Sequence, residues 1–254
     1  MKIRPGIELG SISDVGCVRQ NNEDSYCYAE PESEEEFQKK GRLAMVADGM
    51  GGHEGGQFAS KIAVDTLRDT YLSSGIEDTE QALADAITAA HQAIRSYARE
   101  HPELAGMGTT CTAAVLRGGL LYYGHVGDSR LYLLRDAQIN RVTRDQTVTE
   151  RLVEMGLLKP EDAKTHPDYH VLTTAMGVNE SMEAEFPYAP IPLLAGDVLL
   201  LCTDGLHDLL SDEEIGAMAR QGSAEAACRQ LVETAKARGG HDNITIEIVK
   251  IQAH

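Results

Sequence analysis

The sequence predicts a mixed α+β fold in which two antiparallel β-sheets pack face to face between two pairs of helices, a four-layer α/β/β/α sandwich. Two observations lead to this prediction. Between residues 106 and 142, short runs rich in β-branched and aromatic residues are separated by glycine and aspartate turns, which is typical of antiparallel strands. Before and after this region, pairs of longer stretches place apolar residues at helical spacing, so each pair needs a sheet face to cover.

The first half of the chain contains the first expected strands and helices. Residues 7–13 alternate between apolar and polar side chains, which predicts a half-buried strand, and the apolar run 43–47 predicts a buried one. The segment 31–40 is first acidic and then basic, and it is interpreted as a solvated hairpin loop. Helical spacing in residues 57–73 and 80–100 predicts two antiparallel helices that pack side by side.

The second half returns to strand character before it ends in helices and a strand. Four short runs are predicted to form one antiparallel meander: 109–116, 120–126, 130–135 and 138–142. Residues 145–177, which we call the flap, contain a short predicted helix (148–155) and are interpreted as an insertion beside the sheet. The remaining expected elements are strands 184–189, 197–202 and 244–251 and helices 212–220 and 224–238. No repeat or linker is apparent, so we expect residues 1–254 to form a single domain.

Charge and cysteine content exclude several classes of protein. A net charge of −17 argues against a nucleic-acid-binding protein and against binding to an anionic membrane surface. Five widely spaced cysteines without a Cys-x-x-Cys motif indicate neither a disulfide framework nor a thiolate zinc site. The sequence has no signal peptide and no apolar run near the length of a membrane span, so we expect a cytoplasmic protein.

Acidic residues recur where apolar runs meet glycine-bearing turns. The pattern occurs at Asp48-Gly49, Gly127-Asp128 and Asp204-Gly205, while Asp242 follows two glycines and Glu23-Asp24 follows the first strand. Each aspartate alone is compatible with an ordinary turn, but the repetition is not easily explained in that way. If these turns meet at one edge of the sandwich, the carboxylates cannot all remain ionised without cations. Oxygen ligands suit Mg²⁺ or Mn²⁺.

Six motifs in this chain give a specific resemblance. They are Arg19-x-x-x-Glu23-Asp24, Asp48-Gly49-Met50-Gly51-Gly52-His53, Gly106-Met107-Gly108-Thr109-Thr110, Gly127-Asp128-Ser129-Arg130, Thr203-Asp204-Gly205-Leu206-x-Asp208 and Asp242-Asn243. In this order, and spread over nearly the whole length, they resemble the metal-dependent protein phosphatases of type 2C (PPM), in their compact bacterial form. The resemblance implies the same four-layer fold and a single phosphatase catalytic domain.

The resemblance also implies roles for individual residues. Asp48 would bridge two Mn²⁺ or Mg²⁺ ions, the Gly49 carbonyl would bind one of them, and Asp204 and Asp242 would bind the other. Asp24 and Glu23 would hold metal-bound waters. Asp128 would hold a weaker third ion together with Asp204, and Asn243 would support the ligands. Arg19 would grip the substrate phosphate. His53 could protonate the leaving oxygen or merely order its turn, and the sequence leaves both readings open.

The implied activity is metal-dependent hydrolysis of phosphoserine and phosphothreonine in proteins by a water or hydroxide that bridges the metals. Such an enzyme would oppose a Ser/Thr kinase in bacterial signalling, and we expect it to be a monomer. Three alternatives stay open: a pseudophosphatase that binds without turnover, a hydrolase of small phosphate esters, and a phosphatase of a sigma-factor antagonist.

The flap departs from the family pattern in two places. The family often has Asp-His-Ser/Thr where this chain has Asp145-Gln146-Thr147. It often has Arg-Asn where this chain has Tyr169-His170. These residues shape access to the cleft, so the departures leave substrate preference and flap posture open.

Overall fold

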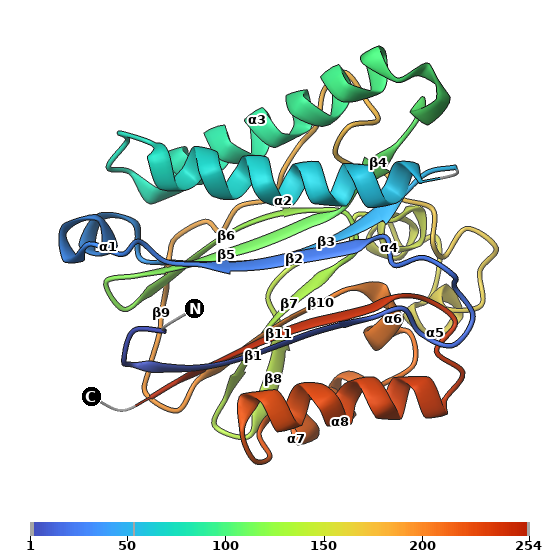
Figure 1. Cartoon of the computed structure of the whole chain (residues 1–254). Helices are drawn as coiled ribbons and strands as arrows, with labels where there is room; N and C mark the ends of the chain where they lie inside the picture. Colours follow the sequence, from blue (N-terminus) through green and yellow to red (C-terminus); the bar gives the residue numbers. More distant parts are fainter. Residues whose placement is uncertain (1–2, 53, 253–254) are drawn as a thin grey trace.

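The computed structural model describes residues 3–52 and 54–252, and it contains two antiparallel sheets (Figure 1). The five-stranded sheet has the order β1-β11-β10-β7-β8, with bounds Ile7–Asp14, Ile244–Ile251, Val198–Cys202, Arg130–Arg135 and Gln138–Arg141. The six-stranded sheet has the order β2-β3-β5-β6-β9, with bounds Asp24–Ala29, Arg42–Met50, Cys111–Arg117, Leu120–Val126 and Ile191–Pro192. Its sixth strand, β4 (Gly108–Thr109), pairs with β3.

Helices cover the two outer faces, which confirms the predicted four-layer sandwich (Figure 1). Helices α2 (Gly55–Ser73) and α3 (Thr79–Glu100) pack on the six-stranded sheet, and α7 (Asp212–Ala219) and α8 (Ala224–Ala237) pack on the five-stranded sheet. A short 3-10 helix, Pro102–Leu104, follows α3. Period-2 alternation along β11 explains the layering, because Ile246 packs toward α8 whereas Val249 packs between the sheets.

The segment expected to be a solvated loop instead contains helix α1 (Glu34–Lys40), so that part of the prediction was wrong. The Ser33 hydroxyl accepts a hydrogen bond from the Glu36 amide and caps the helix. Three acidic residues lie in its first turn and two lysines in its last, an order that stabilises a helix dipole. The charge order that was interpreted as solvation is therefore also a helix signal.

The predicted continuous meander was wrong as well, because the chain changes sheet after β6. Strands β5 and β6 belong to one sheet, and β7 and β8 belong to the other. The crossing occurs at Gly127, whose positive φ of 102° favours glycine, followed by Asp128. Strand periodicity reports which residues alternate but not which sheet they join.

The expected strand 184–189 is also absent from the described structure. Only one isolated bridge forms there, between His125 and Glu185, and the next strand is the two-residue β9. Pro187 and Pro190 lack the amide hydrogens that a longer ladder needs.

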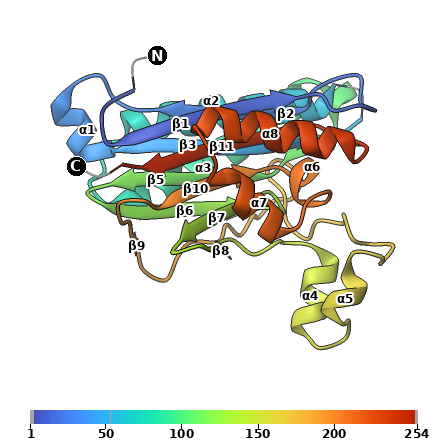
Figure 2. The same ribbon diagram turned by 90° about the horizontal axis from the view of Figure 1, so that it is seen from below.

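The flap projects from one end of the sandwich with its two short helices, α4 (Val148–Glu154) and α5 (Pro160–Ala163) (Figure 2). Both of its ends are tied to the sheets: the Gln146 amide donates to the Gly127 carbonyl at 2.7 Å, and Met176 forms a bridge with Thr109. Among the described residues, no helix combines the length and apolar character needed to cross a bilayer. Helix α6 (Asp204–His207) lies at the same end as the flap.

Glu247 on β11 generates a testable prediction about stability. Its side chain is fully buried, both carboxylate oxygens lack a hydrogen-bond partner among the described residues, and burial raises the pKa of Glu247 well above its usual range. The folded state favours the protonated form of Glu247. The contribution of this group to the free energy of unfolding is therefore complete below its unfolded pKa of about 4.3. As pH rises from there toward the folded pKa, the free energy of unfolding falls by about 1.4 kcal/mol per pH unit. We therefore expect Glu247→Gln to remove this loss.

Guanidinium unfolding at pH 5, 6 and 7 measures the effect. The free energy of unfolding of Glu247→Gln minus that of wild type should grow by about 1.4 kcal/mol per pH unit. Glu233→Gln, at an exposed position on α8, serves as the control and should show no such trend. A difference between Glu247→Gln and wild type that does not change with pH would contradict the interpretation.

Candidate metal centre

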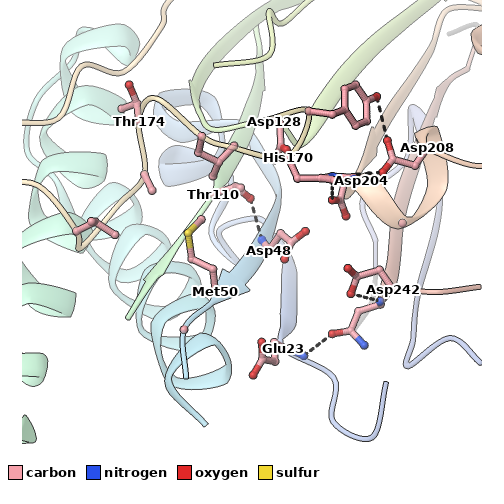
Figure 3. Close-up of a pocket in the computed structure, with 18 of the residues that line it drawn as sticks. Glu23, Asp48, Met50, Thr110, Asp128, His170, Thr174, Asp204, Asp208 and Asp242 are labelled. Carbon is pink, nitrogen blue, oxygen red and sulfur yellow. Dashed lines mark hydrogen bonds and ion pairs between the residues drawn. The ribbon is translucent and has the colours of Figure 1, made fainter. Parts of the chain in front are cut away.

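A cleft of about 1000 Å³ opens at the end of the sandwich where the flap lies (Figure 3). Four of the predicted aspartates line it: Asp48 near the end of β3, Asp128 between β6 and β7, Asp204 at the start of α6 and Asp242 just before β11. These residues are distant in sequence, but Figure 3 shows them around the same open space. The predicted residues Arg19, Glu23, Gly49 and Asn243 also line this cleft.

Asp48 is fixed through its backbone. Its amide donates to the Thr110 hydroxyl at 2.8 Å, and its carbonyl accepts from the Thr110 amide at 2.9 Å and from the Thr109 hydroxyl at 2.8 Å. The Thr110 hydroxyl also hydrogen-bonds the Ser129 hydroxyl at 2.8 Å, which links the end of β3 to the start of β7. These bonds engage no oxygen of the Asp48 side chain, so the carboxylate remains available to the cleft.

Gly49 lies where the end of β3 meets the start of α2, and no side chain fits there. A Cβ atom at this position would lie 2.1 Å from the Gly56 carbonyl oxygen and 2.5 Å from the Glu23 carbonyl oxygen. Both of these neighbours are backbone atoms, which cannot rotate away. The glycine therefore permits the close approach that places Asp48 beside Glu23.

Asp24 lies next to this site as the register partner of Asp48. The Thr203 hydroxyl donates to one of its carboxylate oxygens at 2.9 Å. Burial raises the pKa of Asp24 to about 7, against the opposing effect of hydrogen bonds from Thr245 and Thr203. Asp24 is therefore connected to the start of α6 as well as to β3.

Burial and mutual repulsion dominate the electrostatics of the carboxylates. Burial, followed by the charge of Asp24, raises the pKa of Asp48 well above its usual range, and burial together with Asp204 does the same to the pKa of Asp128. Burial also opposes ionisation of Asp204, but the adjacent His170 imidazole holds the pKa of that carboxyl below its usual range. Protein groups thus offset the cost of burial at Asp204 but not at Asp48 or Asp128.

The donor set fits divalent cations. The Oδ1 atoms of Asp24 and Asp204 are buried and have no hydrogen-bond partner within residues 3–52 and 54–252. Buried carboxylate oxygens without partners are unusual in folded proteins. Carboxylate and carbonyl oxygens are the ligands that Mg²⁺ and Mn²⁺ prefer, and such ions would supply the missing charge.

Arg19 and Asn243 organise the loop that precedes β2. The Arg19 guanidinium donates to Asp242 at 2.7 Å and remains half exposed at the rim of the cleft. The Asn243 side chain accepts from the Glu23 amide at 2.8 Å and donates to the carbonyls of Val15 and Asn21 at 3.0 Å each. Asn243 therefore ties this loop to the start of β11.

The structure also brings into the site residues that the sequence analysis named in a motif or in the flap, or did not name, and to which it assigned no part in metal binding. The side chains of Tyr169, His170 and Asp208 line the cleft, and the buried imidazole of His207 hydrogen-bonds the Asp128 carbonyl at 3.0 Å. Asp208 follows Asp204 by four residues, a spacing that places both on one side of a helical turn and could have revealed it. His53, the other predicted catalytic residue, lies outside the described residues.

Comparisons with known proteins agree with this architecture. The model of the family described as protein phosphatase 2C matches residues 21–245. The serine/threonine protein phosphatase PstP of Mycobacterium tuberculosis is 37% identical over 245 residues, which cover 96% of this chain and 45% of the relative. The serine/threonine phosphatase stp of Listeria monocytogenes is 34% identical over 245 residues, which cover 94% of this chain and 93% of the relative. The chain thus spans about half the length of the Mycobacterium relative.

A solved structure gives the same result at the level of the fold. The catalytic domain of the serine/threonine protein phosphatase PstP, in complex with two manganese ions, superposes with a TM-score of 0.84 at 33% identity, covering 98% of this chain and 99% of that one. The fold therefore matches that of a phosphatase of the PPM type. The chain belongs to the protein phosphatase 2C family, which confirms the resemblance found in the sequence.

The crowded position of Gly49 generates a prediction with a matched control. Gly49→Ala should lower the free energy of unfolding by about 1–3 kcal/mol, because the new methyl group meets two backbone carbonyls. It should also weaken Mn²⁺ binding, because Asp48 must shift. Gly52→Ala lies in the same turn with no heavy atom within 4 Å of the new Cβ, so it should behave as wild type.

Chemical denaturation and calorimetric titration with Mn²⁺ measure both effects. Equal stability and equal metal affinity of the two variants would contradict the account of Gly49.

Proposed function

We propose that the chain hydrolyses phosphoserine and phosphothreonine in proteins in a reaction that depends on Mn²⁺ or Mg²⁺. The observation that carries this proposal is the meeting of Asp48, Asp204 and Asp242 in one open cleft, in a chain of the protein phosphatase 2C family. The chain acts as a single catalytic domain, residues 1–254, with the flap at 145–177 beside its cleft.

In this proposal the carboxylates hold two tightly bound ions. Asp48 would be shared by both ions, with the Gly49 carbonyl at one of them and Asp204 and Asp242 at the other. Asp24 and Glu23 would orient bound waters. Support comes from the unpartnered carboxylate oxygens of the cleft and from the two manganese ions in the PstP relative. When bound, such ions lower the pKa of a water toward neutral and neutralise charge on phosphoryl oxygens.

The protein's own groups bind and orient the phosphate. Arg19 lies at the rim, and its planar fork suits two phosphoryl oxygens at once. Asp242 holds the guanidinium there at 2.7 Å before substrate arrives. No cysteine is among the described residues that line the cleft, and burial raises the pKa of the Cys111 thiol to about 12, so a thiolate nucleophile has no support.

The remaining parts of the proposal concern the third ion and the partners. Asp128 and Asp204 hold a weaker third ion, and both line the cleft. The substrates are phosphorylated proteins, including those of a cytoplasmic Ser/Thr kinase whose action the enzyme reverses, and the enzyme acts as a monomer. A pseudophosphatase would require a missing carboxylate, whereas Asp48, Asp128, Asp204 and Asp242 are all present.

Hydrolysis of phosphopeptides tests the proposal. Wild type should release phosphate from a phosphothreonine peptide in Mn²⁺ and not in excess chelator. Asp204→Ala should reduce turnover by about 100-fold or more, because a lost metal ligand removes several kcal/mol of transition-state stabilisation. Asp69→Ala, exposed on α2, is the control. Near wild-type turnover of Asp204→Ala in saturating Mn²⁺ would refute the site, and no metal-dependent release by wild type would refute the function.

Arg19 generates a separate kinetic prediction. Arg19→Ala should raise KM by about tenfold with a smaller change in kcat, because the fork grips the phosphate in both the ground state and the transition state. Steady-state kinetics on the same peptide provide the measurement. If KM and kcat both stay unchanged, Arg19 does not contact the phosphate.

A further inference from the structure

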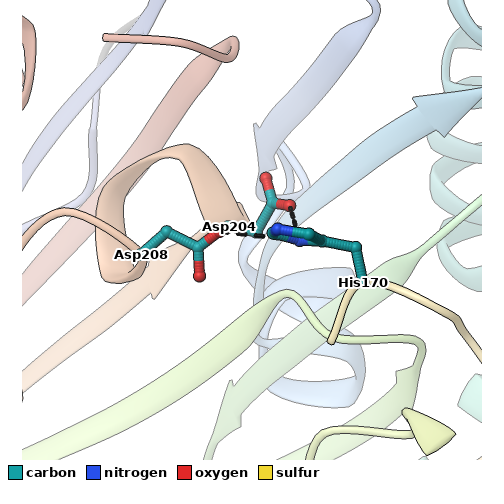
Figure 4. Close-up of side chains that lie close together, drawn as sticks. All are labelled: His170, Asp204 and Asp208. Carbon is teal, nitrogen blue, oxygen red and sulfur yellow. Dashed lines mark ion pairs between the residues drawn. The ribbon is translucent and has the colours of Figure 1, made fainter. Parts of the chain in front are cut away.

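A histidine from the flap meets two aspartates of α6 and its following turn (Figure 4). His170, Asp204 and Asp208 each offer one ligand atom, and these atoms all lie within 4.8 Å of one another. The Nδ1 atom of His170 is 3.7 Å from Asp204 Oδ2 and 3.6 Å from Asp208 Oδ2. Asp128, the residue that the family resemblance joins to Asp204 for a third ion, is not part of this group.

The spacing suits a shared cation better than direct hydrogen bonds. Both separations exceed the range of about 2.7–3.2 Å for an N–H···O bond. Two ligands that lie about 2.1 Å from one ion are roughly 3.0–3.4 Å apart when the angle between them is between octahedral and tetrahedral. A small rotation of side chains would therefore bring the imidazole and both carboxylates onto one ion.

A second, independent observation concerns His207, whose side chain is 2% exposed. Its Nε2 must donate to the Asp128 carbonyl at 3.0 Å, since that carbonyl only accepts, so Nδ1 of the neutral ring carries a lone pair. This Nδ1 has no hydrogen-bond partner among the described residues and faces Asp208 Oδ1 at 3.6 Å. This lone pair thus faces a carboxylate oxygen, and Asp204 Oδ1 is a further acceptor that is buried and unpartnered in the described part of the chain.

Asp208 is held in place for this role by the flap itself. The Tyr169 hydroxyl donates to Asp208 Oδ1 at 3.1 Å, which leaves Oδ2 turned toward His170. Tyr169 and His170 are adjacent in the flap, so one residue orients the carboxylate and the next one approaches it. Both are positions at which the sequence departs from its family.

We propose that His170 is a nitrogen ligand to the third ion proposed above for Asp128 and Asp204, and that Asp208 also binds this ion, so that the ion joins the flap to α6. The proposal rests on the metal-dependent function proposed above. An imidazole ligand suits Mn²⁺ better than Mg²⁺, which prefers oxygen ligands and water. The third site should therefore select Mn²⁺, and its occupancy should restrain the flap.

Pulsed EPR of the Mn²⁺-loaded protein tests the assignment without any need for turnover. At Mn²⁺ concentrations that fill all sites, wild type should show the ¹⁴N coupling of a directly bound imidazole, because the ligands proposed for the other ions are oxygen atoms. His170→Asn should lose this coupling. His241→Asn, which removes an exposed histidine of the same cleft, should keep it. The side chain of His170 is 65% exposed, so its replacement should not disturb folding.

The assignment would be overturned if the ¹⁴N coupling persisted in His170→Asn or were absent from fully loaded wild type. It would also be overturned if the coupling disappeared equally in His241→Asn. Failure of the proposed function would appear instead in the wild-type phosphopeptide assay, which does not depend on this signal.

Limited proteolysis gives a second readout of the same proposal. Trypsin can cut after Arg151 and Lys164 in the flap. Mn²⁺ should slow this cleavage in wild type, and Mg²⁺ at equal concentration should slow it less. His170→Asn should need about tenfold more Mn²⁺ for the same protection, since even partners outside the ligand set change metal affinity by 10–100-fold. Equal protection curves for wild type and His170→Asn would overturn the link between the ion and the flap.

Discussion

Repulsion among buried carboxylates is the constraint on which the site depends. Asp24, Asp48, Asp128 and Asp204 meet where little water can screen them. The Arg19 guanidinium pairs with the neighbouring Asp242 and not with any of these four. A protein that only needed a stable end to its sandwich would fill it with apolar or paired groups. The cluster is best explained by divalent ions, which convert an acidic cleft into one that attracts phosphate.

The fold holds these groups in place through backbone and neutral side chains, which leaves the carboxylates free. Thr109 and Thr110 fix the main chain of Asp48, and Asn243 fixes the loop that carries Glu23. Gly49 allows two backbones to touch where any side chain would separate them. Because strands of both sheets and the start of α6 carry the proposed ligands, the proposal makes an intact sandwich a condition for metal binding.

The sequence predicted the layers and the carboxylates for a clear physical reason. Apolar periodicity and glycine turns are local signals, and Asp48, Asp204 and Asp242 each lie beside one. The change of sheet at Gly127 depends on long-range pairing and left no periodic trace. Helix α1 was missed because its capping serine and ordered charges also fit a solvated loop. The position of His170 against Asp208 depends on the posture of the flap, which no motif encodes.

Anomalous X-ray scattering at the manganese edge, from crystals grown with Mn²⁺, tests the central claim most directly. Two strong peaks should lie in the cleft, one on each side of the Asp48 carboxylate, with Asp204 and Asp242 at bonding distance of one of them. An empty cleft in crystals that contain saturating Mn²⁺, or peaks confined to other surfaces, would contradict the account of the carboxylates as metal ligands.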